Sequence, residues 1–186
     1  MNGYKTFPKD IAKGIKMLVL DVDGVLTEGH VIMTDTGDEM KHFNVRDGHG
    51  IKMLQRAGID VAILTGRTSR VVAHRAADLG IQYVIQGSLR KAEGLKDLCA
   101  QAGILPDDCA YMGDDVVDLP AMMQCRLAAA PHDAHAAVRS KAMWVSDAKG
   151  GAGAVRQLCE GLILANDGWD TILSQAYGVS PQDCGW

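Results

Sequence analysis

Two groups of aspartates stand at the ends of apolar segments. Residues 21–27, DVDGVLT, close the apolar segment 16–22, and residues 113–118, GDDVVD, begin where the segment 109–113 ends. If both segments are strands of a parallel sheet, their carboxyl ends meet at the edge where such sheets bind ligands. In the first group one carboxylate could attack a substrate while the other transfers a proton.

So many carboxylates at one edge need a counter charge. Four or five of them would repel one another strongly unless a cation lay among them. Mg²⁺ prefers oxygen ligands and keeps several waters. The two groups therefore predict a divalent metal site.

A hydroxyl and a lysine complete a site suited to a phosphate group. Thr65, Gly66 and Arg67 end another apolar segment and supply a hydroxyl and backbone N–H groups near the start of a helix, where anions are favoured. Lys91 opens a later helix, and its ammonium can offset phosphoryl and carboxylate charge. The alternatives are structural: Thr65 could cap a helix, Lys91 could be solvated, and the aspartates could form turns or caps.

The elements that must position these residues follow a regular alternation. Short runs rich in Val, Ile and Leu alternate with patterns in which apolar residues recur every three to four positions, which is typical of a parallel sheet covered on both faces. The predicted strands are residues 16–22, 60–65, 82–86, 109–113, 126–129 and 142–146. The predicted helices are residues 48–57, 69–79, 91–102, 116–125, 133–140 and 152–165. We therefore expect an α/β, Rossmann-like fold in a single domain spanning residues 1–186.

One segment breaks the alternation. Residues 29–45 read as two extended stretches around the turn-rich DTGD at 35–38, which predicts a β-hairpin flap after the first strand. Other connections are short, so no cap domain is expected. Residues 167–186 lose their periodicity and are expected to form a tail.

Composition limits the possible partners. The 186 residues are 47% apolar and 23% charged, with a net charge of −4, which disfavours nucleic acid as a partner because phosphate backbones are bound by clustered Lys and Arg. The apolar runs are too short to span a membrane, and the N-terminus has no signal pattern. Five scattered cysteines without a CxxC motif fit reduced thiols, so we expect a cytoplasmic protein.

Four motifs resemble, in order and type, those of the haloacid dehalogenase-like phosphohydrolases: DVDGV at 21–25, TGR at 65–67, Lys91 and GDDVVD at 113–118. Over roughly residues 16–164, FNVRDGHGIKML at 43–54 and YMGDDVVDLPAM at 111–122 are similar to the capless phosphatases of 3-deoxy-D-manno-octulosonate 8-phosphate (Kdo 8-phosphate). The resemblance implies a Mg²⁺-dependent phosphomonoesterase and a homotetramer.

The resemblance also assigns roles. Asp21 would be the nucleophile that forms an aspartyl phosphate, and Asp23 would protonate the leaving alkoxide and then activate water. Mg²⁺ would be bound by the side chains of Asp21 and Asp114 and the backbone carbonyl of Asp23, with Asp115 outside the first ligand sphere. Thr65, Gly66 and Lys91 would hold the phosphoryl oxygens. Asp118, one helical turn beyond Asp114, is a candidate partner for Lys91.

Other residues receive weaker predictions. A substrate carboxylate could be bound by Arg46, Arg67, His74 and Arg75, since Arg forms paired hydrogen bonds to planar anions, although these side chains could equally form surface salt bridges. His30, His42 and His49 are expected in surface or packing roles, and Met112, Met122 and Met123 in the core. The hairpin region holds too many apolar residues to stay free and should pack in an oligomer interface: Val31, Ile32, Met33, Met40, Phe43 and Val45.

Several alternatives remain open at this point. A nine-carbon sugar acid 9-phosphate would use the same machinery with a different entrance. A non-catalytic oligomerisation module of the same fold would be expected to lack Asp23. A receiver-type signalling module is disfavoured, because its phosphorylated Asp follows a mid-chain strand, whereas here the first strand carries the aspartate pair. A dehalogenase is disfavoured because it needs no proton donor for its leaving group, and Asp23 is present.

Overall fold

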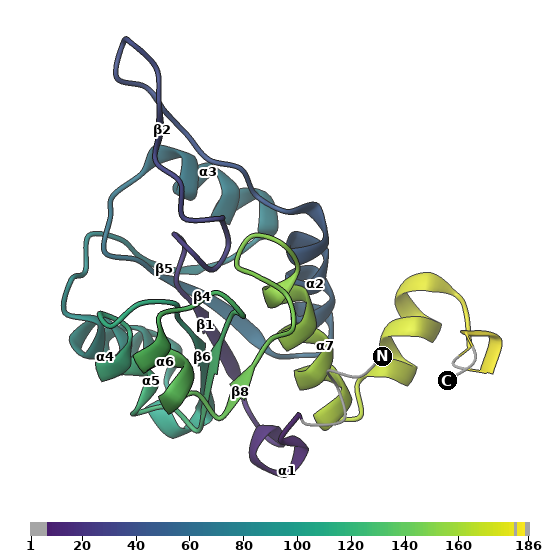
Figure 1. Cartoon of the computed structure of the whole chain (residues 1–186). Coiled ribbons are helices and arrows are strands. Elements are labelled where there is room, and N and C mark those ends of the chain that lie inside the picture. Colours follow the sequence, from purple (N-terminus) through teal and green to yellow (C-terminus); the bar gives the residue numbers. More distant parts are fainter. Residues whose placement is uncertain (1–6, 181, 185–186) are drawn as a thin grey trace.

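Six parallel strands form the central sheet of the computed structural model, which describes residues 7–180 and 182–184. Their order is β5-β4-β1-β6-β7-β8, so the chain moves outward from β1 on one side before it returns to β6 on the other (Figure 1). The strands are β1 (Met17–Leu20), β4 (Asp60–Leu64), β5 (Tyr83–Ile85), β6 (Cys109–Met112), β7 (Leu127–Ala130) and β8 (Trp144–Val145). All six predicted strands are confirmed, with ends that differ by up to two residues.

Helices cover both faces of this sheet (Figure 1). In β1, Leu18 and Leu20 join the core under α2 and α7, whereas Met17 and Val19 join the core under α4 and α5, because successive strand residues point to opposite faces. The helices are α1 (Lys9–Ala12), α2 (Val45–Arg56), α3 (Arg70–Leu79), α4 (Lys91–Ala102), α5 (Leu119–Met122), α6 (Ala136–Lys141), α7 (Ala154–Ala165) and α8 (Trp169–Thr171), with a 3₁₀ turn η2 (Pro106–Asp108). The expected α/β architecture is therefore present.

Two predicted helices begin elsewhere because of side-chain caps. Helix α2 begins at Val45 rather than Gly48, since Asn44 Oδ1 accepts hydrogen bonds from the N–H groups of Arg46 and Asp47. Helix α6 begins at Ala136 rather than Asp133, because His135 Nδ1 accepts a hydrogen bond from the N–H group of Ala137.

The predicted helix 116–125 was wrong in length, because α5 spans Leu119–Met122 alone. Asp118 Oδ2 accepts hydrogen bonds from the N–H groups of Asp114 and Asp115, which holds the preceding residues in turns. The core prediction for Met123 was also wrong: its side chain is 69% exposed just past the end of α5, whereas Met112 and Met122 are buried as predicted.

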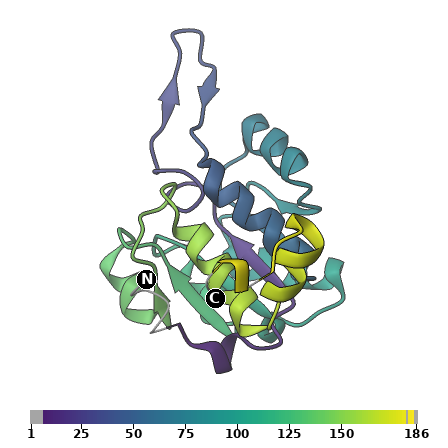
Figure 2. The ribbon, with the colours of Figure 1, turned by 90° about the vertical axis from the view of Figure 1, so that its right-hand side faces the viewer.

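The segment after β1 contains an antiparallel pair, β2 (Ile32–Met33) and β3 (Glu39–Met40), which stands away from the rest of the protein (Figure 2). Gly37 lies in the connecting turn with φ of 85°, a conformation that favours glycine. The predicted segment 29–45 is one residue too long, because Val45 belongs to α2. Residues 29–44 are called the hairpin below.

Residues 167–180 and 182–184 do not form a structureless tail, which the lost periodicity had predicted. Helix α8 continues into a π-helix, η3 (Ile172–Tyr177), and a 3₁₀ turn, η4 (Gln182–Cys184), follows. Trp169 and Ile172 are buried in the core of the α2 and α7 face, and the Tyr177 hydroxyl lies 3.0 Å from Arg56 Nη1. The segment is too short for its apolar pattern to identify a helix. The last predicted tail residue, Trp186, lies outside the described residues.

Within the described residues, the helices are too short or too polar to cross a membrane.

We expect Ile172→Ala to destabilise the protein by about 2–5 kcal/mol, because it removes a side chain that is 1% exposed and leaves a cavity under η3. Urea unfolding followed by circular dichroism would measure the change. The matched control is Gln175→Ala, at an exposed position of the same π-helix, which should change the unfolding midpoint little. If both substitutions changed the free energy of unfolding equally, the side chain of Ile172 would not contribute to the hydrophobic core.

Candidate active site

The site lies at the carboxyl edge of the three central strands. Asp21 directly follows β1, Thr65 directly follows β4, and Asp114 stands two residues after β6. Since β1 is the strand from which the chain departs in both directions, this is where the connections diverge and leave a crevice. A cavity of about 340 Å³ opens there, and it is lined by Asp21, Asp23, Gly29, Thr65, Gly66, Arg67, Leu89, Lys91, Asp114, Asp115 and Val117.

Lys91 is the central cation of this edge. It is the first residue of α4 and is 2% exposed, and its buried ammonium is bound by three oxygen atoms. Lys91 Nζ donates to Asp21 Oδ1 at 2.8 Å and to the Leu64 carbonyl at 2.7 Å, and it lies 3.0 Å from Asp118 Oδ1. The predicted pairing of Asp118 with Lys91 is therefore confirmed, and the buried ammonium joins β1, β4 and the loop after β6.

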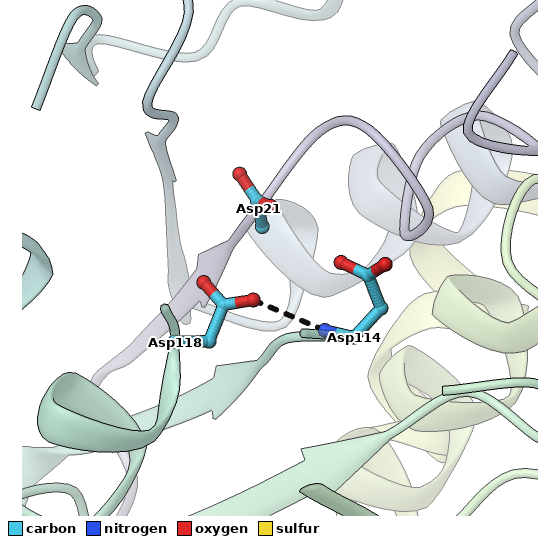
Figure 3. Close-up of side chains that lie close together, drawn as sticks. All are labelled: Asp21, Asp114 and Asp118. Carbon is cyan, nitrogen blue, oxygen red and sulfur yellow. Dashed lines mark hydrogen bonds between the residues drawn. The ribbon is translucent and has the colours of Figure 1, made fainter. Parts of the chain in front are cut away.

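Asp118 accepts hydrogen bonds at both carboxylate oxygens. The Tyr111 hydroxyl donates to Oδ1 at 2.8 Å, while Oδ2 accepts the backbone N–H groups of Asp114 and Asp115 at 3.1 and 3.3 Å. These bonds fold the loop so that the carboxylates of Asp21, Asp114 and Asp118 surround a common space (Figure 3). One oxygen from each lies within 4.8 Å of the others.

Burial and mutual repulsion disfavour the charged forms of these carboxylates. Burial, aided by the charges of Asp21 and Asp118, raises the pKa of Asp114 from 3.8 to about 7. Burial and the charge of Asp118 raise the pKa of Asp21 to about 6, although Lys91 acts in the opposite direction. The site therefore carries more negative charge than Lys91 neutralises.

A divalent cation fits this donor set. Asp21, Asp114 and Asp118 each offer a carboxylate oxygen, the hard ligand that Mg²⁺ prefers, and the loop after β1 passes close to Asp114. Gly24, with φ of 89°, lets this backbone approach Asp114 so closely that a Cβ atom would lie 2.0 Å from Asp114 Oδ2. Asp118 belongs to the same cluster, but its carboxylate is already bound to Lys91, Tyr111 and two backbone N–H groups.

The loop before α7 supports the same backbone from the other side. A Cβ atom on Gly150 would lie 1.7 Å from the Gly24 carbonyl oxygen, so only glycine allows this contact. The buried carboxylate of Asp47 holds the loop, because it accepts the N–H groups of Gly153 and Arg156 at 3.2 and 2.8 Å. Helix α2 thus positions the aspartate loop through a neighbouring segment.

Thr65 is buried beside Lys91 and does not cap α3. Its Oγ1 accepts a hydrogen bond from the Arg67 N–H group at 3.4 Å, and the cap of α3 is Ser69. Thr65 and Gly66 therefore line the cavity with a hydroxyl and backbone groups, as a phosphate site requires.

Asp23 meets charged residues that the sequence had not singled out. Lys41, at the base of the hairpin, forms an ion pair with Asp23 Oδ1, and its Nζ also lies 3.2 Å from Glu39 Oε1. Glu39 in turn accepts from Ser69 Oγ at 2.5 Å and from Arg67 Nη2 at 3.3 Å. The available signal was the spacing of Glu39 and Lys41 around Met40 in an extended stretch, which puts both charges on one side.

The predicted substrate-binding residues are divided between the cavity and the surface. Arg67 lines the cavity, but Arg46 and His74 are exposed, and Arg75 pairs with Asp78 at 2.6 Å. The guanidinium of Arg75 also covers the ring of Phe43 at 5.7 Å. Within one chain, the structure does not bring Arg46, His74 and Arg75 to the cavity.

Comparisons with known proteins identify the family of this chain. The family model described as haloacid dehalogenase-like hydrolase matches residues 48–125. The 3-deoxy-D-manno-octulosonate 8-phosphate phosphatase KdsC of Escherichia coli K12 is 42% identical over 165 residues, covering 89% of this chain and 88% of that protein. The phosphatase of that name from Yersinia pestis has a crystal structure that matches with a TM-score of 0.84 at 43% identity, covering 86% of each chain.

A further solved structure contains ligands. The 3-deoxy-D-manno-octulosonate 8-phosphate phosphatase of Moraxella catarrhalis, in complex with a magnesium ion, a phosphate ion and a KDO molecule, matches with a TM-score of 0.87 at 37% identity and covers 90% of this chain and 96% of its own. The chain therefore belongs to the haloacid dehalogenase-like hydrolases and, within them, to the family of 3-deoxy-D-manno-octulosonate 8-phosphate phosphatases, which are phosphoric monoester hydrolases.

Proposed function

We propose that this protein hydrolyses Kdo 8-phosphate to Kdo and inorganic phosphate, with Mg²⁺ as cofactor and an aspartyl phosphate on Asp21 as the intermediate. The observation that carries the proposal is the pairing of the buried Lys91 with Asp21 at the cavity floor. The names of the relatives support the substrate.

The proposed ligands of Mg²⁺ are the side chains of Asp21 and Asp114 and the backbone carbonyl of Asp23. When bound, the ion would neutralise charge on the phosphoryl group and offset the repulsion among the carboxylates. The donor set and the close approach of Gly24 to Asp114 support this assignment.

In the first step, Asp21 attacks phosphorus, the bond from phosphorus to the ester oxygen breaks, and Asp23 gives its proton to the departing alkoxide. In the second step, Asp23 takes a proton from a water that attacks the phosphorus of the aspartyl phosphate, and Asp21 is released. Lys91 fixes the carboxylate of Asp21 and offers positive charge to the phosphoryl oxygens, while Thr65 and the N–H group of Gly66 offer hydrogen bonds.

The remaining proposed roles concern substrate and assembly. Arg67 is the proposed partner of the substrate carboxylate inside one chain, and Arg46, His74 and Arg75 could contribute from a neighbouring copy. We take residues 1–186 as a single capless domain, since the described strands form one sheet and one hairpin. Four free, buried cysteines support a reducing, cytoplasmic location: Cys99, Cys109, Cys125 and Cys159.

The proposed homotetramer rests on the exposed apolar residues of the hairpin. Val31, Met33 and Met40 are 58, 62 and 49% exposed, and Leu89 at the cavity is 76% exposed. Such a group of apolar side chains around a site is typical of a surface that a partner covers. Phe43 is set apart from this group, because it packs against the core of its own chain.

Phosphate release from a panel of sugar phosphates tests the substrate. We expect Kdo 8-phosphate to be turned over faster than simple hexose phosphates, and only with Mg²⁺. Asp21→Asn should lower kcat by on the order of 10⁴-fold or more, because the nucleophile is lost. Equal turnover of the panel would contradict the narrow substrate, preference for a nine-carbon 9-phosphate would select the alternative, and an active Asp21→Asn would contradict the mechanism.

Stability should depend on pH and on Mg²⁺ together. Because the pKa values of Asp21 and Asp114 are raised from 3.8 to about 6 and about 7 in the folded protein, the folded state binds more protons than the unfolded state between about pH 3.8 and about pH 7. The metal-free protein should therefore lose stability as the pH rises through this range. Bound Mg²⁺ removes that penalty.

We expect Mg²⁺ to raise the melting temperature more at about pH 8 than at about pH 5, where protons compete for the same carboxylates. At a hundredfold excess over Kd the ion should add about 2.7 kcal/mol. Thermal unfolding with Mg²⁺ or with a chelator measures the difference, and Asp114→Asn should abolish it. A rise in melting temperature that is the same at both pH values would place the ion elsewhere.

Sedimentation velocity tests the assembly. The wild type should sediment as a tetramer, and Met33→Asp should dissociate it, because a charge would be buried in the interface. Ile11→Asp, which changes an exposed apolar residue on α1, is the matched control. A fully active wild-type monomer would contradict the proposal.

A further inference from the structure

The hairpin reaches the site through a buried charge. The side chain of Lys41 is 2% exposed, although apolar hairpin residues such as Val31 and Met33 face outward. A buried ammonium is costly unless it is closely paired, and Lys41 is paired with Asp23 and Glu39. We propose that Lys41 is a positioning residue that holds the carboxylate of Asp23 in place for proton transfer, an inference that rests on the role of Asp23 proposed above.

Asp23 is held between cations from two different elements. Lys41 of the hairpin pairs with Oδ1, and Arg67 from the loop after β4 places its Nε 3.8 Å from Oδ2. The short side chain of Asp23 is otherwise free to rotate toward solvent, since 26% of it is exposed. Lys41 holds Oδ1 in a close ion pair, whereas Arg67 stays beyond hydrogen-bond distance of Oδ2, so the carboxyl group is oriented while Oδ2 can still carry the proton that is delivered to the leaving oxygen.

Glu39 keeps Lys41 from swinging away. Its carboxylate lies 3.2 Å from Lys41 Nζ and is itself anchored by Ser69 Oγ and Arg67 Nη2. The hydrogen bond from Ser69, followed by the nearby Lys41, holds the pKa of Glu39 below its usual value. Since Ser69 caps α3, the base of the hairpin is tied to a helix of the main fold. The ammonium of Lys41 is therefore presented to Asp23 from a fixed point.

The role predicts a dependence on the leaving group. An alkoxide needs a proton as it departs, whereas p-nitrophenolate is stable without one. A residue that orients the proton donor should therefore matter for a sugar phosphate and little for p-nitrophenyl phosphate. The informative quantity is kcat/KM, because it covers the steps up to departure of the alcohol and omits hydrolysis of the aspartyl phosphate.

We expect Lys41→Met to lower kcat/KM for Kdo 8-phosphate by about 10- to 100-fold and to change that for p-nitrophenyl phosphate by less than about threefold. Lys41→Arg should recover most of the loss, since it keeps the charge. Lys16→Met is the matched control, because it removes another ion-paired lysine, at the opposite edge of the sheet, and should leave both values unchanged. Melting temperatures measured alongside would identify a variant that fails to fold.

Asp23→Asn separates failure of the inference from failure of the proposed function. It should show the same selective loss, and a larger one. If Asp23→Asn is selective but Lys41→Met lowers both substrates equally, Lys41 has a general structural role and the inference is overturned. If Asp23→Asn also lowers kcat/KM equally for both substrates, the proton-transfer role of Asp23 is wrong, and the inference about Lys41 is wrong with it. The nucleophile role of Asp21 is tested separately by Asp21→Asn.

Discussion

The organisation of the site depends on one buried ammonium. Lys91 forms ion pairs with Asp21 and Asp118 at the carboxyl edge of the sheet and also donates a hydrogen bond to the carbonyl that ends β4. Three carboxylates this close would otherwise repel one another, and burial increases the cost because water no longer screens them. Even with Lys91 present, the pKa values of Asp21 and Asp114 stay raised, so the fold retains an excess of negative charge for a cation to offset.

That electrostatic requirement explains several local features that helical or strand preference alone would not produce. Helix α5 is short because the carboxylate of Asp118 accepts hydrogen bonds from Tyr111 and from two backbone N–H groups of the preceding loop, and pairs with Lys91. These bonds hold the loop in turns where a longer helix would otherwise begin. Gly24 and Gly150 stand where two loops meet, because a side chain at either position would collide with Asp114 or with the Gly24 carbonyl. The loops at this edge are thus shaped by the charges they carry.

The hairpin follows a different principle from the core. Its apolar residues are largely exposed, and its contact with the site consists of the charges of Lys41 and Glu39 against Asp23, Arg67 and Ser69. Because ionic contacts depend on geometry, this arrangement ties the position of the hairpin to that of Asp23. The exposed apolar side is the surface that the proposed homotetramer would cover.

The sequence alone predicted the six strands and the meeting of Asp21, Thr65, Lys91 and Asp114 at one edge of the sheet, because apolar periodicity and residue type at strand ends are local properties. Helix ends were less predictable, since the caps Asn44 and His135 lie outside the apolar pattern. Only the tertiary structure decided that Lys41 meets Asp23, that Asp118 binds Tyr111, and that Trp169 and Ile172 complete the core. These contacts depend on how the loops, the hairpin and the C-terminal helices pack in three dimensions, which the local apolar pattern does not specify.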